Sequence, residues 1–267
     1  MPFSEIHPDP GSRIYRVQPL AALLLLPARH TPASGIDSAG QTRGLPIMPR
    51  RPRRGTAGHV FHVMNRAARR LPLFEREEDY AAFLHALRDA QARIPLRLLS
   101  YAVMPNHWHL VVWPAKDDDL SRYMAWLTGT HARRWHLHRR SVGSGTIYQG
   151  RYKAVAVKDD HHLLVACRYV ERNPVKAHLA CRAADWPWSS ASAAGPLRPH
   201  LATWPVTRPE PWSDYVDQGE SRDEFASLRA AIRSNTPFGP AGWREEVAAA
   251  LNWRAGLRPR GRPPGSG

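Results

Sequence analysis

The pattern of hydrophobic and polar positions becomes regular from about residue 59 onward. Residues 59–65, 96–104, 107–113 and 153–158 are short, apolar and β-rich, so they predict four strands. Residues 77–93 and 120–138 carry apolar side chains at helical spacing and predict two helices. A third helix, capped by Asp159 or Asp160, is expected to run to about Arg172. The order is therefore β-α-β-β-α-β followed by one more helix.

This order is typical of the split βαβ arrangement of ferredoxin-like folds. We expect an α+β fold with a central antiparallel sheet, two helices on one face, and the extra helix across the sheet or at its edge. The pattern loosens after residue 188, where residues 197–211 are proline-rich and residues 223–232 and 243–253 suggest two short helices. The predicted domains are a disordered or spurious N-terminal extension (1–47), a domain that contains the whole predicted sheet (48–188), and a helical and irregular extension with a basic tail (189–267).

The charge of the chain restricts its partners. The formal net charge is +15 and the sequence pI is about 10.8, which favours a polyanionic partner. No run of about 18 apolar residues is present to span a bilayer, so nucleic acid is favoured over a membrane. The two cysteines, Cys167 and Cys181, form no disulfide framework and fit a reducing compartment. We expect a cytoplasmic protein associated with the nucleoid.

Two histidines on a predicted strand are candidates for metal ligands. His107 and His109 flank Trp108, and residues i and i+2 of a strand point to the same face. A bare HxH pair is more often two half-buried histidines. This pair, however, directly follows the turn Pro105-Asn106, where a ligand can reach the end of the strand.

A candidate nucleophile and a candidate third ligand lie downstream. Tyr169 and Asn173 are four residues apart on the predicted helix and therefore share one face. A tyrosine hydroxyl, with an ordinary pKa of about 10, attacks phosphorus well only when a metal polarises the phosphate. Taken alone, Tyr169 would be read as a residue packed on the sheet. Asn173 alone would be read as a helix cap before Pro174.

Cations and aromatic residues alternate between residues 119 and 159, where no Asp or Glu intervenes. Such a track suits single-stranded nucleic acid, because phosphates pair with cations and bases stack on rings. An ordinary solvated helix face would carry both signs of charge. Tyr148 and Tyr152 are rival nucleophiles, but a structural or base-stacking role is favoured for them. The residues expected to bind DNA are Arg66, Arg133, Arg134, Arg139, Arg140, Arg151, Lys153, Arg258, Arg260 and Arg262.

Two segments closely resemble signature segments of the REP-associated tyrosine transposases, which belong to the single-tyrosine HUH transposases of bacterial insertion sequences. They are Met104-Pro-Asn-His-Trp-His-Leu110 and Tyr169-Val-Glu-Arg-Asn-Pro-Val-Lys-Ala177, about sixty residues apart. The resemblance runs from about Met48 onward and includes Trp188-Ser-Ser190 and the basic segment 258–263. One departure is Ala67-Ala68, where the family commonly has Gly-Asn.

The resemblance implies a metal-dependent transposase that binds hairpin-bearing single-stranded DNA, nicks it and transfers strands. Residues 48–188 would be its HUH catalytic domain and residues 189–267 its DNA-binding extension. His107, His109 and Asn173 would bind Mg²⁺ or Mn²⁺, and Tyr169 would form a 5′-phosphotyrosine link and release a 3′-OH. The protein would work as a monomer or a homodimer. The alternatives are a domesticated DNA-binding protein that no longer cuts and an RNA-binding module. The intact set of four candidate residues favours the enzyme. The segment 258–263 resembles a minor-groove tail, although a simple basic tail explains it nearly as well.

Overall fold

The computed structural model of the protein describes residues 55–194, 197–218 and 222–251. The predicted N-terminal extension (1–47) and the tail residues Arg258, Arg260 and Arg262 lie outside these residues. Within them, no helix is long and apolar enough to cross a lipid bilayer.

Four strands form one sheet in the order β2-β3-β1-β4, and every neighbouring pair is antiparallel. The strands are β1 (Val60–Arg66), β2 (Leu96–Met104), β3 (His107–Pro114) and β4 (Lys153–Val157). Helix α1 (Glu77–Arg93) connects β1 to β2, and helix α2 (Asp119–His138) connects β3 to β4. Both connections cross over a strand, which confirms the predicted ferredoxin-like α+β fold.

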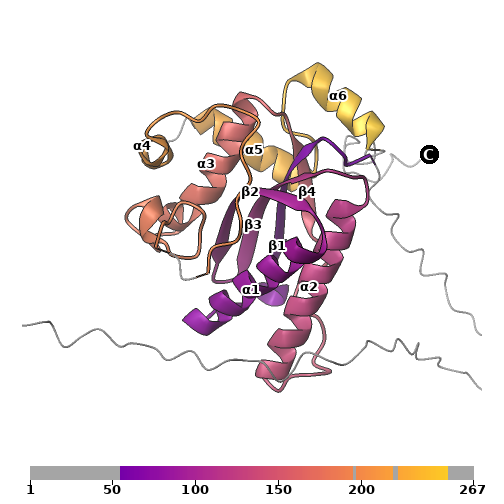
Figure 1. Cartoon of the computed structure of the whole chain (residues 1–267), viewed down its shortest axis with the longest axis vertical. Coiled ribbons are helices and arrows are strands. Elements are labelled where there is room, and N and C mark those ends of the chain that lie inside the picture. Colours follow the sequence, from indigo (N-terminus) through magenta and orange to yellow (C-terminus); the bar gives the residue numbers. More distant parts are fainter. Residues whose placement is uncertain (1–54, 195–196, 219–221, 252–267) are drawn as a thin grey trace, which may run out of the picture. The chain divides into compact units, whose positions relative to one another are not determined.

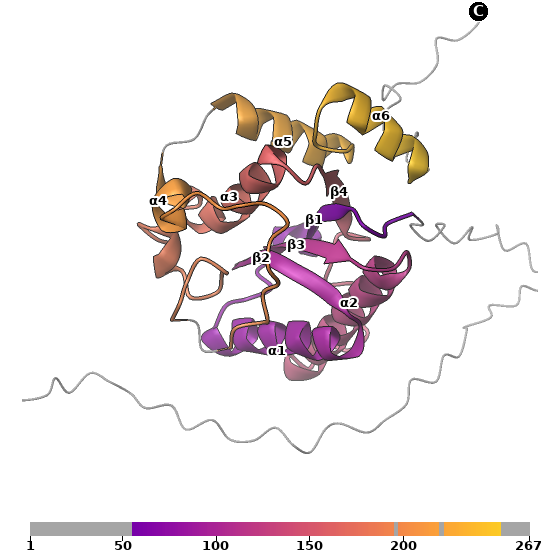
Figure 2. The ribbon, with the colours of Figure 1, turned by 45° about the horizontal axis from the view of Figure 1, so that its top comes forward.

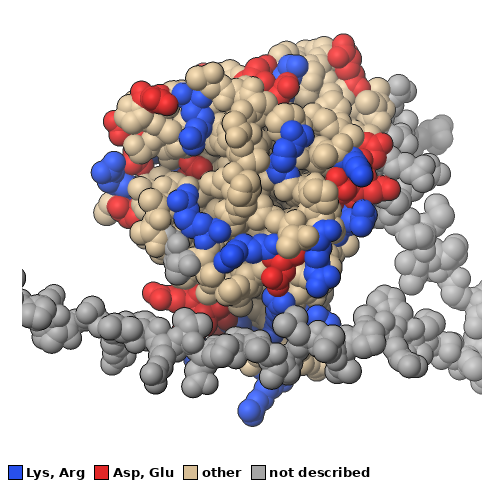
Figure 3. Space-filling model, in the orientation of Figure 1, with Lys and Arg blue, Asp and Glu red and all other residues tan. Residues whose placement is uncertain are grey.

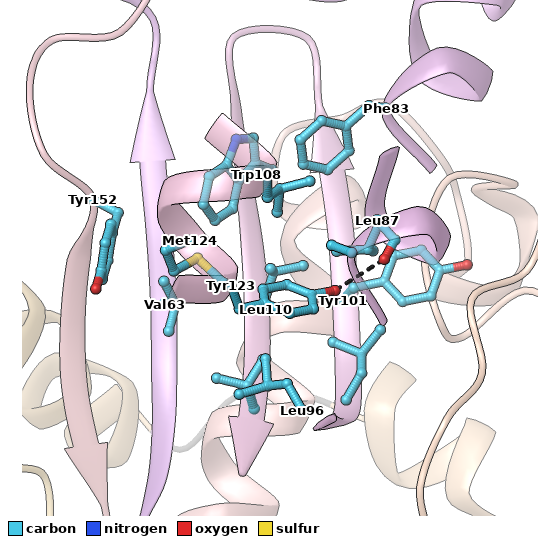
Figure 4. Packing of buried hydrophobic residues seen from close by; sticks show 14 of the residues in the cluster. Val63, Phe83, Leu87, Leu96, Tyr101, Trp108, Leu110, Tyr123, Met124 and Tyr152 are labelled. Atoms are coloured by element: carbon cyan, nitrogen blue, oxygen red, sulfur yellow. Dashed lines mark hydrogen bonds between the residues drawn. The ribbon is translucent and has the colours of Figure 1, made fainter. Parts of the chain in front are cut away.

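Helices cover both faces of the sheet (Figures 1 and 2). Helices α1 and α2 pack on one face, and helix α3 (His161–Lys176) lies across the other. Side chains alternate along β3, so Trp108 and Leu110 join the core under α1 and α2, while Val111 joins the core under α3. In the first core, the buried Tyr123 hydroxyl donates a hydrogen bond to the Leu87 carbonyl at 3.0 Å (Figure 4).

Residues after 188 complete the sheet rather than standing apart from it. The backbone N–H of Val103 in β2 donates to the Trp188 carbonyl, and the Phe238 N–H donates to the Ala156 carbonyl of β4. These two strands are the edges of the sheet, so both edges are paired with later parts of the chain. The remaining elements are two short 3₁₀ turns, η1 (Ala68–Arg70) and η2 (Ala183–Asp185), and the helices α4 (Trp212–Asp217), α5 (Arg222–Ser234) and α6 (Ala241–Ala250).

Helix α3 does not end before Pro174, so the prediction that Asn173 is its C-cap is wrong. The helix continues to Lys176 with Pro174 buried inside it. A proline removes one backbone donor, which normally breaks or kinks a helix. Here the hydrogen bonds resume directly, since the Ala177 N–H donates to the Asn173 carbonyl and the Leu179 N–H to the Pro174 carbonyl. Burial of this turn against the rest of the molecule outweighs the lost donor.

Candidate active site

His107 and His109 lie on the face of β3 that α3 covers. Their ring centroids are 4.9 Å apart and the rings are nearly perpendicular. His107 is half-buried and His109 is only 2% exposed. The intervening Trp108 points into the opposite core, so the strand supports the pair from behind. The structure therefore brings the two imidazoles together on one face, as the i, i+2 spacing predicts.

Each of these imidazoles has its Nδ1 atom engaged by a neighbour. His107 Nδ1 lies 2.7 Å from Asn106 Oδ1, and an amide oxygen only accepts, so Nδ1–H donates. His109 Nδ1 lies 2.9 Å from Nε2 of His62 on β1. This arrangement directs the Nε2 atom of His107 away from the Asn106 side chain and leaves its lone pair for a ligand.

Burial keeps the site's histidines neutral at ordinary pH. It lowers the pKa of His107 to about 4, helped by the charge of Arg66. It lowers the pKa of His109 well below its usual range, with further contributions from His107, His62 and Arg66. Neutral imidazole is the form that binds a metal ion, so these shifts suit a ligand role.

Tyr169 approaches this pair from α3. Its ring centroid lies 5.9 Å from that of His109 and 6.0 Å from that of His62, edge-on to both. On its other side it packs against Phe225 of α5 at 5.6 Å. Tyr169 is half-buried, so the residue keeps some contact with solvent. The helix thus brings a tyrosine to the face of the sheet that carries the histidines.

Asn173 lies one helical turn beyond Tyr169, and its contact is with its own helix. Its side-chain Nδ2 donates to the Tyr169 carbonyl at 2.7 Å. The amide thereby stabilises the turn that carries Tyr169, next to the proline. Its oxygen is the atom that would serve as a metal ligand.

Arg66 is the cation nearest the pair in the sheet register. It is the last residue of β1 and lies directly opposite His107 on β3. Both side chains project from the same face, and the charge of Arg66 contributes to the lowered pKa values of His107 and His109. The site therefore combines neutral imidazole nitrogens with a positive charge.

The atoms available for metal binding decide which metal ion would fit this site. Within the described residues, no cluster of three or more His, Cys, Asp or Glu is arranged to hold a metal ion. Two imidazoles and one amide oxygen form a sparse, neutral set that leaves positions for phosphate oxygens and water. These residues fit a divalent cation that is bound together with an anionic substrate.

The basic interval, the cation-rich segment between residues 119 and 159, contains no acidic residue but forms ion pairs with acidic residues from elsewhere in the chain. Arg134 forms an ion pair with Asp89 at 3.1 Å, and Arg139 forms ion pairs with Glu75 and Asp79 at 3.0 Å each. All three acids precede β2 in the chain, so the absence of acids between residues 119 and 159 does not mean unpaired arginines. Figure 3 accordingly shows cationic and acidic side chains interleaved over this face.

The other predicted DNA-binding residues of the interval differ in environment. Arg133, Arg140 and Arg151 are exposed. The Lys153 ammonium donates to the Ile232 carbonyl at 3.2 Å, near the C-terminal end of α5. Because α2 packs on the face opposite Tyr169, Arg133 lies on the other layer from the histidine pair.

Tyr148 and Tyr152 lie in the opposite core, as their structural interpretation expects. Tyr148 Oη accepts a hydrogen bond from Trp108 Nε1 at 3.1 Å and lies 2.7 Å from His131 Nδ1. Burial raises the pKa of Tyr148 above its usual range. Tyr152 is 6% exposed in the same cluster. Neither ring shares a face with the histidine pair.

The sequence motifs do not reveal the roles of two residues in and beside the site, His62 and Glu171. In the sequence, His62 looks like an ordinary polar residue of a strand. Because side chains alternate along β1, His62 nevertheless projects from the same face as Met64 and Arg66. Glu171 is fully buried, and its carboxylate accepts hydrogen bonds from Ser190 Oγ at 2.5 Å, Ser100 Oγ at 3.2 Å and Trp212 Nε1 at 2.7 Å. These bonds attach α3 to β2 and to the C-terminal segment.

An irregularity in β2 makes the attachment possible. The register with β3 shifts between Leu98 and Ser100, so Leu99 and Ser100 both face α3 while Leu98 and Tyr101 face the other core. A bulge of this kind re-aims side chains. Alternation alone would have placed Ser100 on the wrong face.

Known proteins that resemble this chain are described as transposases. Residues 56–173, which contain both histidines and Tyr169, match the family described as "Transposase IS200 like". A REP-associated tyrosine transposase of Escherichia coli K12 is 26% identical over 139 residues, 50% of this chain and 76% of that protein. The chain is therefore similar to the REP-associated tyrosine transposases. A Haemophilus influenzae protein given the same family name is 26% identical over 116 residues, 40% of this chain and 66% of that protein.

A solved structure is also similar to this chain. It is described as a REP-associated tyrosine transposase bound to a REP hairpin, with 25% identity, a TM-score of 0.43, and coverage of 56% of this chain and 86% of the other.

The departure from the family pattern at Ala67-Ala68 is compatible with the local backbone. Ala67 has φ −56° and ψ 141°, which any residue adopts, and the positive φ of this turn falls on Arg69.

Proposed function

We propose that the protein cleaves and rejoins single-stranded DNA next to hairpins, with Tyr169 as the nucleophile. The observation that carries the proposal is the approach of the Tyr169 ring on α3 to the His109 ring on the sheet face that α3 covers, with ring centroids 5.9 Å apart. A single-tyrosine nuclease needs its hydroxyl beside its metal ligands. The two rings come from elements about sixty residues apart, so this contact is a property of the fold rather than of a local motif.

The proposed reaction is a transesterification at phosphorus. Tyr169 Oη attacks the phosphorus, the bond from phosphorus to the 3′-oxygen breaks, and the tyrosine proton ends on the released 3′-OH. The product is a 5′-phosphotyrosine link, so the energy of the broken bond is retained and the reverse attack by a 3′-OH rejoins the strand.

The chain's own residues would prepare this step. His107, His109 and Asn173 would hold Mg²⁺ or Mn²⁺, which when bound supplies Lewis-acid polarisation of the phosphate. Arg66, beside His107, would pair with a phosphate oxygen and stabilise the charge of the transition state. Phe225 and His62 would confine the Tyr169 ring from either side.

Binding of the DNA would use exposed cations in addition to the site. Arg133, Arg140 and Arg151 are suited to phosphates at a distance from the cleavage point, on a hairpin that extends past the sheet. The hairpin named for the similar solved structure makes hairpin-bearing single strands the first substrate to test.

The test is covalent capture of DNA in the presence of Mn²⁺. The protein should form an adduct with a hairpin-bearing single strand, and peptide mapping should find the DNA on Tyr169. Tyr169→Phe should abolish the adduct while hairpin binding stays within about twofold, because the ring and its packing remain. Tyr215→Phe, a matched loss of a hydroxyl on α4, should leave the adduct unchanged.

Further variants separate the roles of the ligands. His107→Ala should stop cleavage, with partial recovery at high Mn²⁺, and Asn173→Ala should reduce it less because water replaces a neutral oxygen ligand. Hairpin binding without an adduct at any Mn²⁺ concentration would instead identify a DNA-binding protein that does not cut. An adduct mapped to another tyrosine would refute the site.

A further inference from the structure

A third imidazole lies beside His109 on the same face of the sheet. His62 on β1 is 1% exposed, and its ring stacks on that of His109 with centroids 5.1 Å apart and an interplanar angle of 12°. The register pairs Met64 with His109, so His62 is a diagonal neighbour on the same face. Its Nε2 is 2.9 Å from His109 Nδ1, and this bond is fully buried.

This hydrogen bond has two possible directions with different chemistry. If His109 Nδ1–H donates to His62 Nε2, the lone pair of His109 is on Nε2, where it can bind a metal ion. If His62 Nε2–H donates to His109 Nδ1, the hydrogen of neutral His109 is on Nε2 and blocks that atom. The hydrogen position on His62 therefore decides whether His109 is a competent ligand.

The usual partner of a metal-binding histidine is a carboxylate or a backbone carbonyl, which only accepts and so permits one tautomer. His62 differs, because an imidazole nitrogen can be donor or acceptor. Within the described residues, its other nitrogen, Nδ1, is buried and has no hydrogen-bond partner. No third group in that part of the chain fixes the direction of the bond. His107 offers a contrast, since the Asn106 oxygen fixes its Nδ1–H.

We propose that His62 is a positioning residue that sets the tautomer of His109 and thereby the affinity of the site for a divalent cation. The proposal rests on the proposed function, since it assumes that His107 and His109 bind the cation. In the competent form, His62 carries its hydrogen on the buried Nδ1 and presents Nε2 as the acceptor. Cation binding then selects this form of both rings together.

The first experiment measures Mn²⁺ binding to the full-length protein without DNA, by electron paramagnetic resonance. His62→Gln keeps an acceptor oxygen in the side chain, and its affinity should stay within about threefold of wild type. His62→Leu keeps apolar packing but has no acceptor, and its affinity should fall by about 10- to 100-fold. His131→Leu, which removes an equally buried imidazole from the opposite core, controls for general loosening and should leave the affinity unchanged.

The second experiment reads the tautomer directly and requires no variant to fold. Nitrogen-15 spectra of histidine-labelled wild type should show His109 protonated on Nδ1 once Mg²⁺ is added, with His62 also protonated on Nδ1. Equal Mn²⁺ affinity of wild type and His62→Leu, or a His62 protonated on Nε2 in the Mg²⁺ form, would overturn the inference. Failure of wild type to bind Mn²⁺ in a His107-dependent way would instead refute the metal site of the proposed function.

Discussion

Acidification should destabilise the fold through a histidine on the side of the sheet away from the site. His131 on α2 is 4% exposed and stacks on Phe74 at 5.3 Å. Its Nδ1 lies 2.7 Å from Tyr148 Oη, which also accepts from the Trp108 indole. These bonds link α2 to Trp108 in the core under α1 and α2, so the stability of that core depends on a neutral His131.

The size of the effect follows from the pKa difference between the two states. Burial lowers the pKa of His131 to about 3 in the folded protein, whereas an unfolded histidine titrates near 6.5. The unfolded state therefore binds the extra proton between these values, and stability is complete above pH 6.5 and lost as pH falls toward 3. At pH 5 the loss from this residue alone is about 2 kcal/mol, since each unit below 6.5 costs about 1.4 kcal/mol.

The assay is urea unfolding of wild type and His131→Gln at pH 7.5 and pH 5. Glutamine retains a hydrogen-bonding group for Tyr148 but does not titrate. The free energy of unfolding of wild type should fall by about 2 kcal/mol more than that of the variant over this interval. The other buried histidines remain in both proteins and cancel in the difference. An identical pH dependence of the two proteins would show that His131 is not held neutral by the fold.

Two further predictions concern the DNA-binding surface and the anchor of α3. Removing Arg133 and Arg140, which are exposed, should reduce the slope of log affinity against log salt for a single strand by about 1.4, or ~0.7 per phosphate contact; an unchanged slope would assign them to ordinary solvated surface. Glu171→Ala should lower the free energy of unfolding by about 3 kcal/mol or more, because donors on three residues, two of them buried, lose their acceptor. Glu171→Gln should cost clearly less in the same urea titration, since one acceptor oxygen remains, and equal losses would show that the hydrogen bonds are not the cause.

The sequence predicts those parts of the fold that depend on local periodicity. The bounds of α1 and β2 match their predicted residues, because their apolar spacing is regular over the whole element. The shared face of His107 and His109 follows from strand geometry alone. The approach of Tyr169 to that face is a tertiary contact, and only the resemblance to a known family led to it.

The misses share one physical cause, namely interactions between distant segments. Pro174 lies inside α3 because tertiary burial outweighs a local helix-breaking signal. Arg134 and Arg139 form ion pairs with acidic residues on α1, and this pairing cannot be predicted from the local sequence around the two arginines. His62 becomes significant only once β1 is placed beside β3, and the register shift in β2 that turns Ser100 toward Glu171 carries no motif.

The residues that hold α3 in place come late in the chain, and this has a consequence for synthesis on the ribosome. The candidate ligands, Tyr169 and all four strands are translated before residue 188, yet the groups that clamp α3 follow it: Ser190, Trp212 and Phe225. At ~5–20 residues per second, several seconds separate Tyr169 from Phe225. A nascent chain therefore carries every candidate catalytic group before its nucleophile is held in place, and ribosome-bound chains stalled before residue 190 should lack the ordered tyrosine that the released full-length chain possesses.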